Sequence, residues 1–407
     1  MRGKTTRQLP ILLAVSVESF VPAEHPLRGV RRLALEAMKE LEPVFDNAYS
    51  RVGRPSIPPE QLLLTLLLQS LYSVRSERQI CEQLQYNLLY RWFVGLELTD
   101  PAFGASTFSK NRRRVLEDSV CDRFLQSVVG LARKQGLLGD DSFSVDGTII
   151  EASASHKSLV PKATDDDNDD EPGAGPPTPE AGAGSQADAV DAAQNDESQA
   201  VQDARFAGTE TRRRDGNGWS SFKGEHRSNR THVSKTDPEA RLVRKSHCHP
   251  AVLGYAVNAL MDNKKRLMVG VRADIATGTI ERDAALDLVR EHAPGSRRIR
   301  LAADKAYDTR DFIERCRELG ITPHVARNTG RGRRRSNIDG RTTRHDGYRA
   351  SQRARKQIEQ IFAWLKAPGR MRKVFLRGVE KVDAQVKLAA AAFNLLRISR
   401  LIGAAMA

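Results

Sequence analysis

The stretch FSVDGTII, residues 143–150, decides the fold. Its residues alternate between two faces, with Val145 and Ile149 on one face and Asp146 on the other. A period of two predicts a β-strand, because successive side chains point to opposite sides of a sheet. The sequence therefore predicts a strand that carries one carboxylate away from its apolar face.

Further strands and helices follow this one in a fixed order. VLGYAVNALMD and RLMVGVRADI, residues 252–262 and 266–275, are separated by the turn-like DNKK and predict a hairpin. We then expect a Thr-capped helix in residues 279–292, the strand RIRLAADKAYD in 298–308, a helix between Thr309 and Gly320, and the short strand ITPHVAR in 321–327.

Three early strands followed by alternating helix and strand are the layout of a ribonuclease-H-like core, in which the fourth strand lies parallel to the first. The prediction is an α/β domain of ribonuclease-H-like fold, a mixed sheet flanked by helices. It spans residues 141–162 and 232–400.

Asp304 is the second carboxylate, at the end of the strand predicted for residues 298–308. It points away from the apolar face that Leu301 and Ala303 form. Because the first and fourth strands are expected to be neighbours, Asp146 and Asp304 would be close enough to bind the same cation. Mg²⁺ suits such a pair, since water and substrate phosphate complete its octahedron.

The segment RASQRARKQIEQIFAWLK, residues 349–366, offers a third carboxylate on a predicted helix. At about 100° per residue, Arg355 and Lys366 lie within about 40° of Glu359. A carboxylate between two cations suits metal binding together with contact to phosphates, whereas a plain Arg–Glu surface pair is the alternative reading. The buried stripe of this helix is predicted to be Ile358, Ile361, Phe362 and Leu365.

The charge of the chain points to a polyanionic partner. There are 65 Lys and Arg against 51 Asp and Glu, a formal net charge of +14. Nucleic acid is the first candidate for such an excess. Residues 163–231 read as an insertion, a disordered acidic linker (163–204) followed by a basic segment. The rest of the chain is therefore more basic than the total suggests.

Residues 1–140 are predicted to be a helical, DNA-binding domain. Short helices joined by tight turns, one capped by Ser76 and one ending near Gly95, are the elements of a helix-turn-helix unit. A further basic helix, STFSKNRRRVLEDS, could contact phosphates, and a solvated charged face is an equal alternative. Its candidate DNA-binding residues are Lys110, Arg112, Arg113 and Arg114.

A second basic tract, residues 327–356, is rich in glycine and leads into the Glu359 helix. Such a tract can follow a phosphate backbone, and Arg333, Arg334 and Arg335 are its candidate DNA contacts. DNA binding could order the helix and complete the site.

Cysteine usage and hydropathy bear on the compartment. The four cysteines form no CxxC pair, which favours a reducing compartment and argues against a zinc ribbon. No signal peptide is expected, and no run approaches the ~20 apolar residues of a membrane helix. We expect a cytoplasmic protein.

At these residues the sequence resembles the DDE-type insertion-sequence transposases of bacterial mobile elements, specifically the InsH-like group. The resemblance rests on residues 54–96, FSVDGTIIEA, LAADKAYDT and SQRARKQIEQIFAWLK, in this order and spacing. In this family a Y-x2-R-x3-E-x6-K motif surrounds the catalytic glutamate. Arg355, Glu359 and Lys366 match this motif, and Gln352 stands where the tyrosine would be.

The resemblance implies a transposase in which Asp146, Asp304 and Glu359 are the catalytic and metal-binding residues. They would hold two Mg²⁺ ions about 4 Å apart, with Mn²⁺ able to substitute. Water would cut at the element's ends, and the freed 3′-hydroxyl would attack target DNA. The implied partners are terminal inverted repeats and target DNA, bound by a homodimer or higher oligomer. The alternatives are a ribonuclease-H-like nuclease without joining activity and a domesticated DNA-binding regulator.

Overall fold

The computed structural model describes residues 16–48, 56–117, 119–162, 221–222, 225–244, 249–292, 298–328 and 336–406. The chain divides into two compact units, Met1–Leu159 with Ser234–Ala407, and Val160–Val233. The helical part and the sheet part that the sequence predicts both belong to the first of these units.

The larger unit begins with helices. They are η1 Val17–Phe20, α1 Leu27–Met38, η2 Lys39–Leu41, α2 Glu42–Ala48, α3 Pro59–Leu71, α4 Glu77–Tyr86, α5 Leu88–Val94, α6 Ala105–Glu117 and α7 Val120–Lys134. The Ser76 hydroxyl accepts a hydrogen bond from the Gln79 N–H (2.9 Å) and caps α4, as predicted. Gly95 ends α5 in the left-handed region (φ +85°), where glycine carries no steric penalty. The described part of the chain before Ser142 contains helices and no strand.

A mixed sheet follows, and its strands lie in the order β10-β9-β1-β7-β6, with β8 also paired to β7. The strands are β1 Ser142–Glu151, β6 Arg241–Val243, β7 Val252–Asp262, β8 Leu267–Ile275, β9 Arg300–Ala303 and β10 Thr322–Val325. β1 pairs antiparallel with β7 and parallel with β9, and β9 is parallel to β10. The predicted hairpin, β7–β8, and the parallel pairing of the first strand with the Asp304 strand are therefore confirmed.

Helices cover both faces of this sheet. All residues of β7 except Val252 are buried, which requires packing on each side of the strand. α9 Ile280–His292 packs against β1, β7 and β8, whereas α12 Asp346–Arg355 packs against β1, β9 and β10. The remaining helices are η3 His156–Ser158, η5 Lys305–Tyr307, α10 Arg310–Glu318, α11 Gly340–Arg344, α13 Ile358–Lys366 and α14 Val379–Met406.

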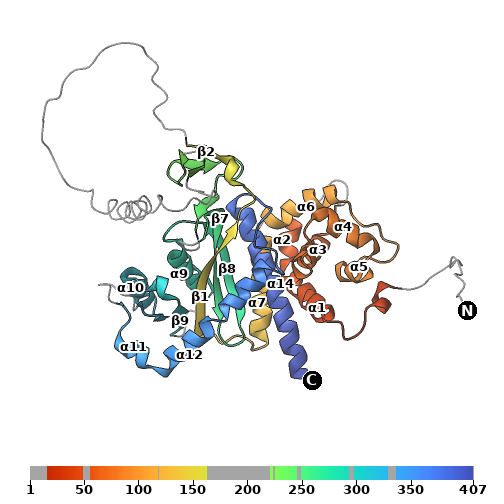
Figure 1. The fold of residues 1–407 in the computed structure, drawn as a ribbon. Helices are drawn as coiled ribbons and strands as arrows, with labels where there is room; N and C mark the ends of the chain where they lie inside the picture. The colour runs from red at the N-terminus through yellow and green to blue at the C-terminus, as the bar shows by residue number, and fades with distance from the viewer. Residues whose placement is uncertain are drawn as a thin grey trace, which may run out of the picture. The chain divides into compact units, whose positions relative to one another are not determined.

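The last helix, α14, connects the N-terminal helices to the sheet (Figure 1). It contacts α1, α3, α6 and α7 on the one hand and β8 on the other. The run Ala389–Ala392 is fully buried, and its small side chains allow neighbouring elements to approach closely. Asn394 lies one turn further on, also fully buried, and bonds both backbone groups of Met268 in β8. These bonds continue the hydrogen bonding of β8 on the side away from β7.

Replacing Asn394 by Ala is expected to destabilise the protein by about 2–4 kcal/mol, because the Met268 N–H and C=O would both lose a buried partner. The Asn394 amide now accepts from that N–H at 3.0 Å and donates to that C=O at 2.8 Å. Urea denaturation followed by circular dichroism measures the free energy of unfolding. Arg400→Ala, an exposed change on the same helix, serves as the control and should cost less than about 0.5 kcal/mol. A loss below about 1 kcal/mol for Asn394→Ala would contradict this role.

The smaller unit, Val160–Val233, contains short strands. β2 Leu159–Pro161 pairs with β5 His232–Ser234, and β3 Ser221–Phe222 pairs antiparallel with β4 Glu225–His226. The predicted acidic linker, residues 163–204, lies outside the described residues.

Two predicted elements differ in the structure. The strand expected over residues 298–308 ends at Ala303, because the next residue, Asp304, caps the short helix η5 through its side chain. The prediction of a single helix over residues 349–366 is wrong. It is divided into α12 and α13 at Lys356–Gln357, where the Gln357 N–H bonds to Ala354, three residues back, and tightens the turn.

None of the helices that the structure describes combines the length and the apolar character needed to cross a bilayer.

Candidate active site

Asp146 lies in β1, and Asp304 directly follows β9, the parallel strand beside it. The register of β1 with β9 pairs Ser144 with Ala302. Each aspartate comes two residues after the last paired position on its own strand, so the structure brings these two predicted residues together. Both side chains are partly exposed, which leaves them accessible to a ligand.

The surroundings of Asp146 disfavour its charged form. The pKa of Asp146 is raised to about 6, chiefly by burial and also by the charges of Asp304 and Glu281. A hydrogen bond from the Gly147 N–H (2.9 Å) and the positive charge of Arg355 act in the opposite direction. The charges of two other carboxylates and one guanidinium therefore act on the pKa of Asp146.

Glu281 is a member of this cluster that the sequence analysis did not single out. It lies in the first turn of α9, and its pKa is raised by burial and by the charge of Asp304. A Cβ atom placed on Gly147 would lie 2.9 Å from Oε1 of Glu281, so this carboxylate sits directly against β1. An acidic residue in a first helical turn is usually explained by the helix dipole, so no sequence pattern marks Glu281 as a site residue.

Tyr307 is a second residue of the cluster, placed by η5. Its side chain is 1% exposed, and its hydroxyl has no hydrogen-bond partner among the residues that the structure describes. Burial raises the pKa of Tyr307 well above its usual value, and the charges of Glu281, Asp146 and Asp304 add to this effect. The phenol therefore lies near these three carboxylates.

Glu359 stands apart from the two aspartates. It is exposed in the first turn of α13, and the buried residues of that helix are the four that the sequence predicts. In the described ranges no three His, Cys, Asp or Glu side chains are close enough to hold a metal ion together. The structure thus brings together Asp146 and Asp304 but not Glu359.

The cations of the predicted motif are also separated by the helix break. Arg355 belongs to α12, and its charge lowers the pKa of Asp146. Its buried Nε has no hydrogen-bond partner in the described ranges. Lys366 ends α13 and is partly buried. Arg355 and Glu359 therefore belong to two successive helices, joined by a tightened turn at Lys356–Gln357.

Gln352 stands where the family motif has tyrosine. Its side chain hydrogen-bonds α12 to residues of β9 and β10. Its amide donates to the carbonyl oxygens of His324 and Ala303, the latter at 3.3 Å. The Tyr348 hydroxyl donates to the Val325 carbonyl oxygen (3.0 Å), and Ser351 bonds the His324 ring (2.8 Å). These bonds hold α12 beside the residue that precedes Asp304.

The predicted DNA-binding residues of α6 have different surroundings. Lys110 and Arg113 are exposed, whereas Arg112 forms an ion pair with Glu77 that joins α6 to α4. The side chain of Arg114 and the residues Arg333, Arg334 and Arg335 lie outside the described part of the chain.

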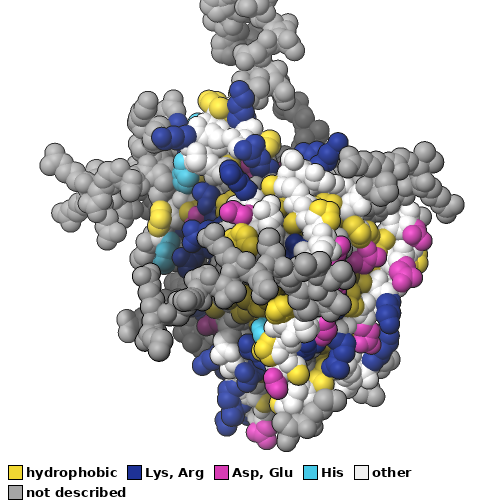
Figure 2. Space-filling view, turned by 90° about the vertical axis from the view of Figure 1, so that its right-hand side faces the viewer, with side chains coloured by type: hydrophobic (Ala, Val, Ile, Leu, Met, Phe, Trp, Pro, Cys, Tyr) yellow, Lys and Arg dark blue, Asp and Glu magenta, His cyan; other side chains and the backbone are white. Residues whose placement is uncertain are grey.

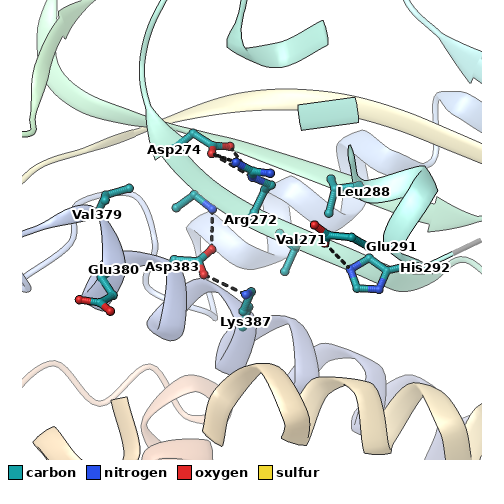
Figure 3. Close-up of a pocket in the computed structure, with 11 residues that line it drawn as sticks. Val271, Arg272, Asp274, Leu288, Glu291, His292, Val379, Glu380, Asp383 and Lys387 are labelled. Atoms are coloured by element: carbon teal, nitrogen blue, oxygen red, sulfur yellow. Dashed lines mark hydrogen bonds and ion pairs between the residues drawn. The ribbon is translucent and has the colours of Figure 1, made fainter. Parts of the chain in front are cut away.

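A separate cavity of about 320 Å³ lies between β8, α9 and α14 (Figure 3). The Asp383 carboxylate accepts a hydrogen bond from the Ala273 N–H (2.7 Å) and pairs with Lys387 (3.0 Å). Lys387 also reaches Asp122 of α7 (2.8 Å), and Arg272 pairs with Asp274 (2.6 Å). This ionic network connects three elements and includes none of the predicted site residues.

Comparison with known proteins assigns the family. A family model described as "Transposase domain (DUF772)" matches residues 15–114, and another described as "Transposase DDE domain" matches residues 216–395. A search of the curated proteins found no match.

Two solved structures are similar to this chain at low identity. One is a piggyBac transposase synaptic complex with hairpin DNA, at 9% identity over 93% of this chain and 76% of that chain, with a TM-score of 0.36. The other is a pre-cleavage Mos1 transpososome, at 9% identity over 86% and 82%, with a TM-score of 0.19. The assignment rests on the two family models: the chain belongs to the DDE-type insertion-sequence transposases and is a DNA transposase.

Proposed function

We propose that this transposase cuts DNA at the ends of its element and joins the freed 3′ ends to target DNA, in a reaction that depends on Mg²⁺. The observation that carries the proposal is the closeness of Asp146, in β1, to Asp304, which directly follows the neighbouring parallel strand β9. The strand order, with this pair at the centre of the sheet, supports a ribonuclease-H-like fold. We assign the chain to the InsH-like group on the motifs around its three carboxylates.

The two aspartates fit a divalent ion. They are hard oxygen ligands, and the charge of Asp304 opposes ionisation of Asp146, a repulsion that a bound cation would relieve. Divalent ions at this position would polarise the scissile phosphate and stabilise the leaving oxygen. We propose that Glu359 joins the aspartates when α13 moves on binding DNA.

The remaining candidate residues would bind and orient DNA. Arg355, beside Asp146, is placed to neutralise a phosphate next to the reacting bond, and Lys366 would hold the strand further along. Figure 2 shows Lys and Arg side chains over much of one face, with Asp and Glu side chains between them. The other proposed DNA contacts are Lys110, Arg112, Arg113, Arg114, Arg333, Arg334 and Arg335.

We further propose that at least two copies act together on DNA. An element has two ends, and joining both to one target requires that they be held side by side. A homodimer or higher oligomer, bound to the terminal inverted repeats and to target DNA, meets this need.

An assay with labelled element-end DNA and a target plasmid tests the function. We expect cleaved and joined products with Mg²⁺ or Mn²⁺, and neither product when a chelator removes the ion. Cleavage without joining in the presence of both DNA molecules would favour the nuclease alternative. Binding without cleavage would favour a regulator.

A further inference from the structure

We propose that Glu281 helps to hold the divalent ion at Asp146 and Asp304, by accepting hydrogen bonds from water molecules that the ion coordinates. This inference rests on the proposed metal site. Glu281, from α9, would be a fourth carboxylate of the site, in addition to Asp146, Asp304 and Glu359.

The position of Glu281 follows from the close packing of α9 on the sheet. α9 contacts β1 and β7, and Gly147 of β1 has no side chain to obstruct the approach. A Cβ at Gly147 would lie 2.9 Å from Oε1 of Glu281 and 3.0 Å from Oδ1 of Asn258, both closer than ordinary contacts. The two oxygens therefore occupy the space beside the residue that follows Asp146.

Two buried polar groups at this place lack a partner. Asn258 is fully buried, and within the described part of the chain neither its Oδ1 nor the Tyr307 hydroxyl has a hydrogen-bond partner. Such groups are costly unless a ligand or water satisfies them. A hydrated ion can supply what both need, because its water molecules can donate hydrogen bonds to the amide oxygen and to the phenol oxygen.

The carboxylate of Glu281 is itself available for this role. It has no hydrogen-bond or ion-pair partner among the residues that the structure describes, although it is largely buried. No three acidic groups there are close enough to coordinate one ion directly. Mg²⁺ normally keeps several water molecules, so Glu281 acts through them and needs no direct bond to the metal.

Titration of the DNA-free protein with Mn²⁺, followed by electron paramagnetic resonance of the free ion, tests the proposal. Glu281→Gln is expected to weaken Mn²⁺ binding by about 10- to 100-fold, the usual effect of losing an outer-shell partner. Glu291→Gln, on the same helix with its side chain 57% exposed, should bind as the wild type does. Asp146→Asn should lose the site.

Thermal melting without metal separates this role from a structural one. Glu281→Gln should melt at or above the wild-type temperature, because it removes a buried negative charge close to Asp304. Weaker binding together with a lower melting temperature would mark a structural role and overturn the proposal. Unchanged binding in Glu281→Gln, with binding lost in Asp146→Asn, would refute only the role of Glu281. Unchanged binding in Asp146→Asn would refute the proposed metal site as well.

Discussion

Replacing Asp304 by Asn is expected to lower both end cleavage and strand transfer by at least about 10³-fold. Divalent ions contribute several kcal/mol to stabilising a phosphoryl-transfer transition state, and each 1.36 kcal/mol corresponds to about tenfold in rate. Asparagine keeps an oxygen at this position but removes the charge that attracts the ion. Initial rates on labelled element-end DNA, measured with saturating Mg²⁺, give the comparison.

The fold should tolerate this change. Oδ1 of Asp304 accepts a hydrogen bond from the Ala306 N–H (2.7 Å), and an asparagine oxygen can accept the same bond. Asp311→Asn is a matched control, because that aspartate lies seven residues further on with its side chain 71% exposed. Its activity and DNA binding should match the wild type. If Asp304→Asn retained cleavage within tenfold of the wild-type rate, the catalytic assignment of Asp304 would be wrong.

Replacing Asp146 by Asn is expected to abolish activity and also to stabilise the metal-free protein, by about 1–3 kcal/mol at pH 8. The pKa of this carboxyl is about 6 in the folded protein, compared with its ordinary value of 3.8. Folding therefore favours the protonated form. As the pH rises from 3.8 through 6, the wild-type protein loses stability, and above pH 6 the full loss is present.

Asparagine does not ionise, so the Asp146→Asn variant should become more stable than the wild type as the pH rises through the same range. The difference in the free energy of unfolding should vanish below about pH 4. Asparagine also keeps an oxygen for the Gly147 N–H, which now donates to Asp146 at 2.9 Å. Urea denaturation in the presence of a chelator, at pH 4 and pH 8, gives the two free energies of unfolding. Adding Mg²⁺ should stabilise the wild type and leave Asp146→Asn unchanged. A variant less stable than the wild type at pH 8 would contradict the proposed repulsion.

Local sequence patterns were sufficient to predict most elements and two of the site residues. The alternation in residues 143–150 predicts β1, the Ser76 and Thr309 caps predict the starts of α4 and α10, and the confirmed parallel pairing brings Asp146 beside Asp304. These predictions succeed because side-chain period and capping act over a few residues. The rule for connecting parallel strands adds the one long-range step.

Only the tertiary structure determines the contacts between elements that are distant in the sequence. Glu281 reaches the site because α9 packs over Gly147, a contact between residues more than a hundred positions apart. Arg355 and Glu359 belong to two helices because the helix is interrupted at Lys356–Gln357, in a segment whose local pattern fits one continuous helix. Gln352 takes its partners from the ends of two strands, which no spacing along the chain could indicate. The sequence by itself determined where the carboxylates Asp146 and Asp304 lie, because strand period is local. Packing decided which other groups surround them, because burial and close approach depend on the whole fold.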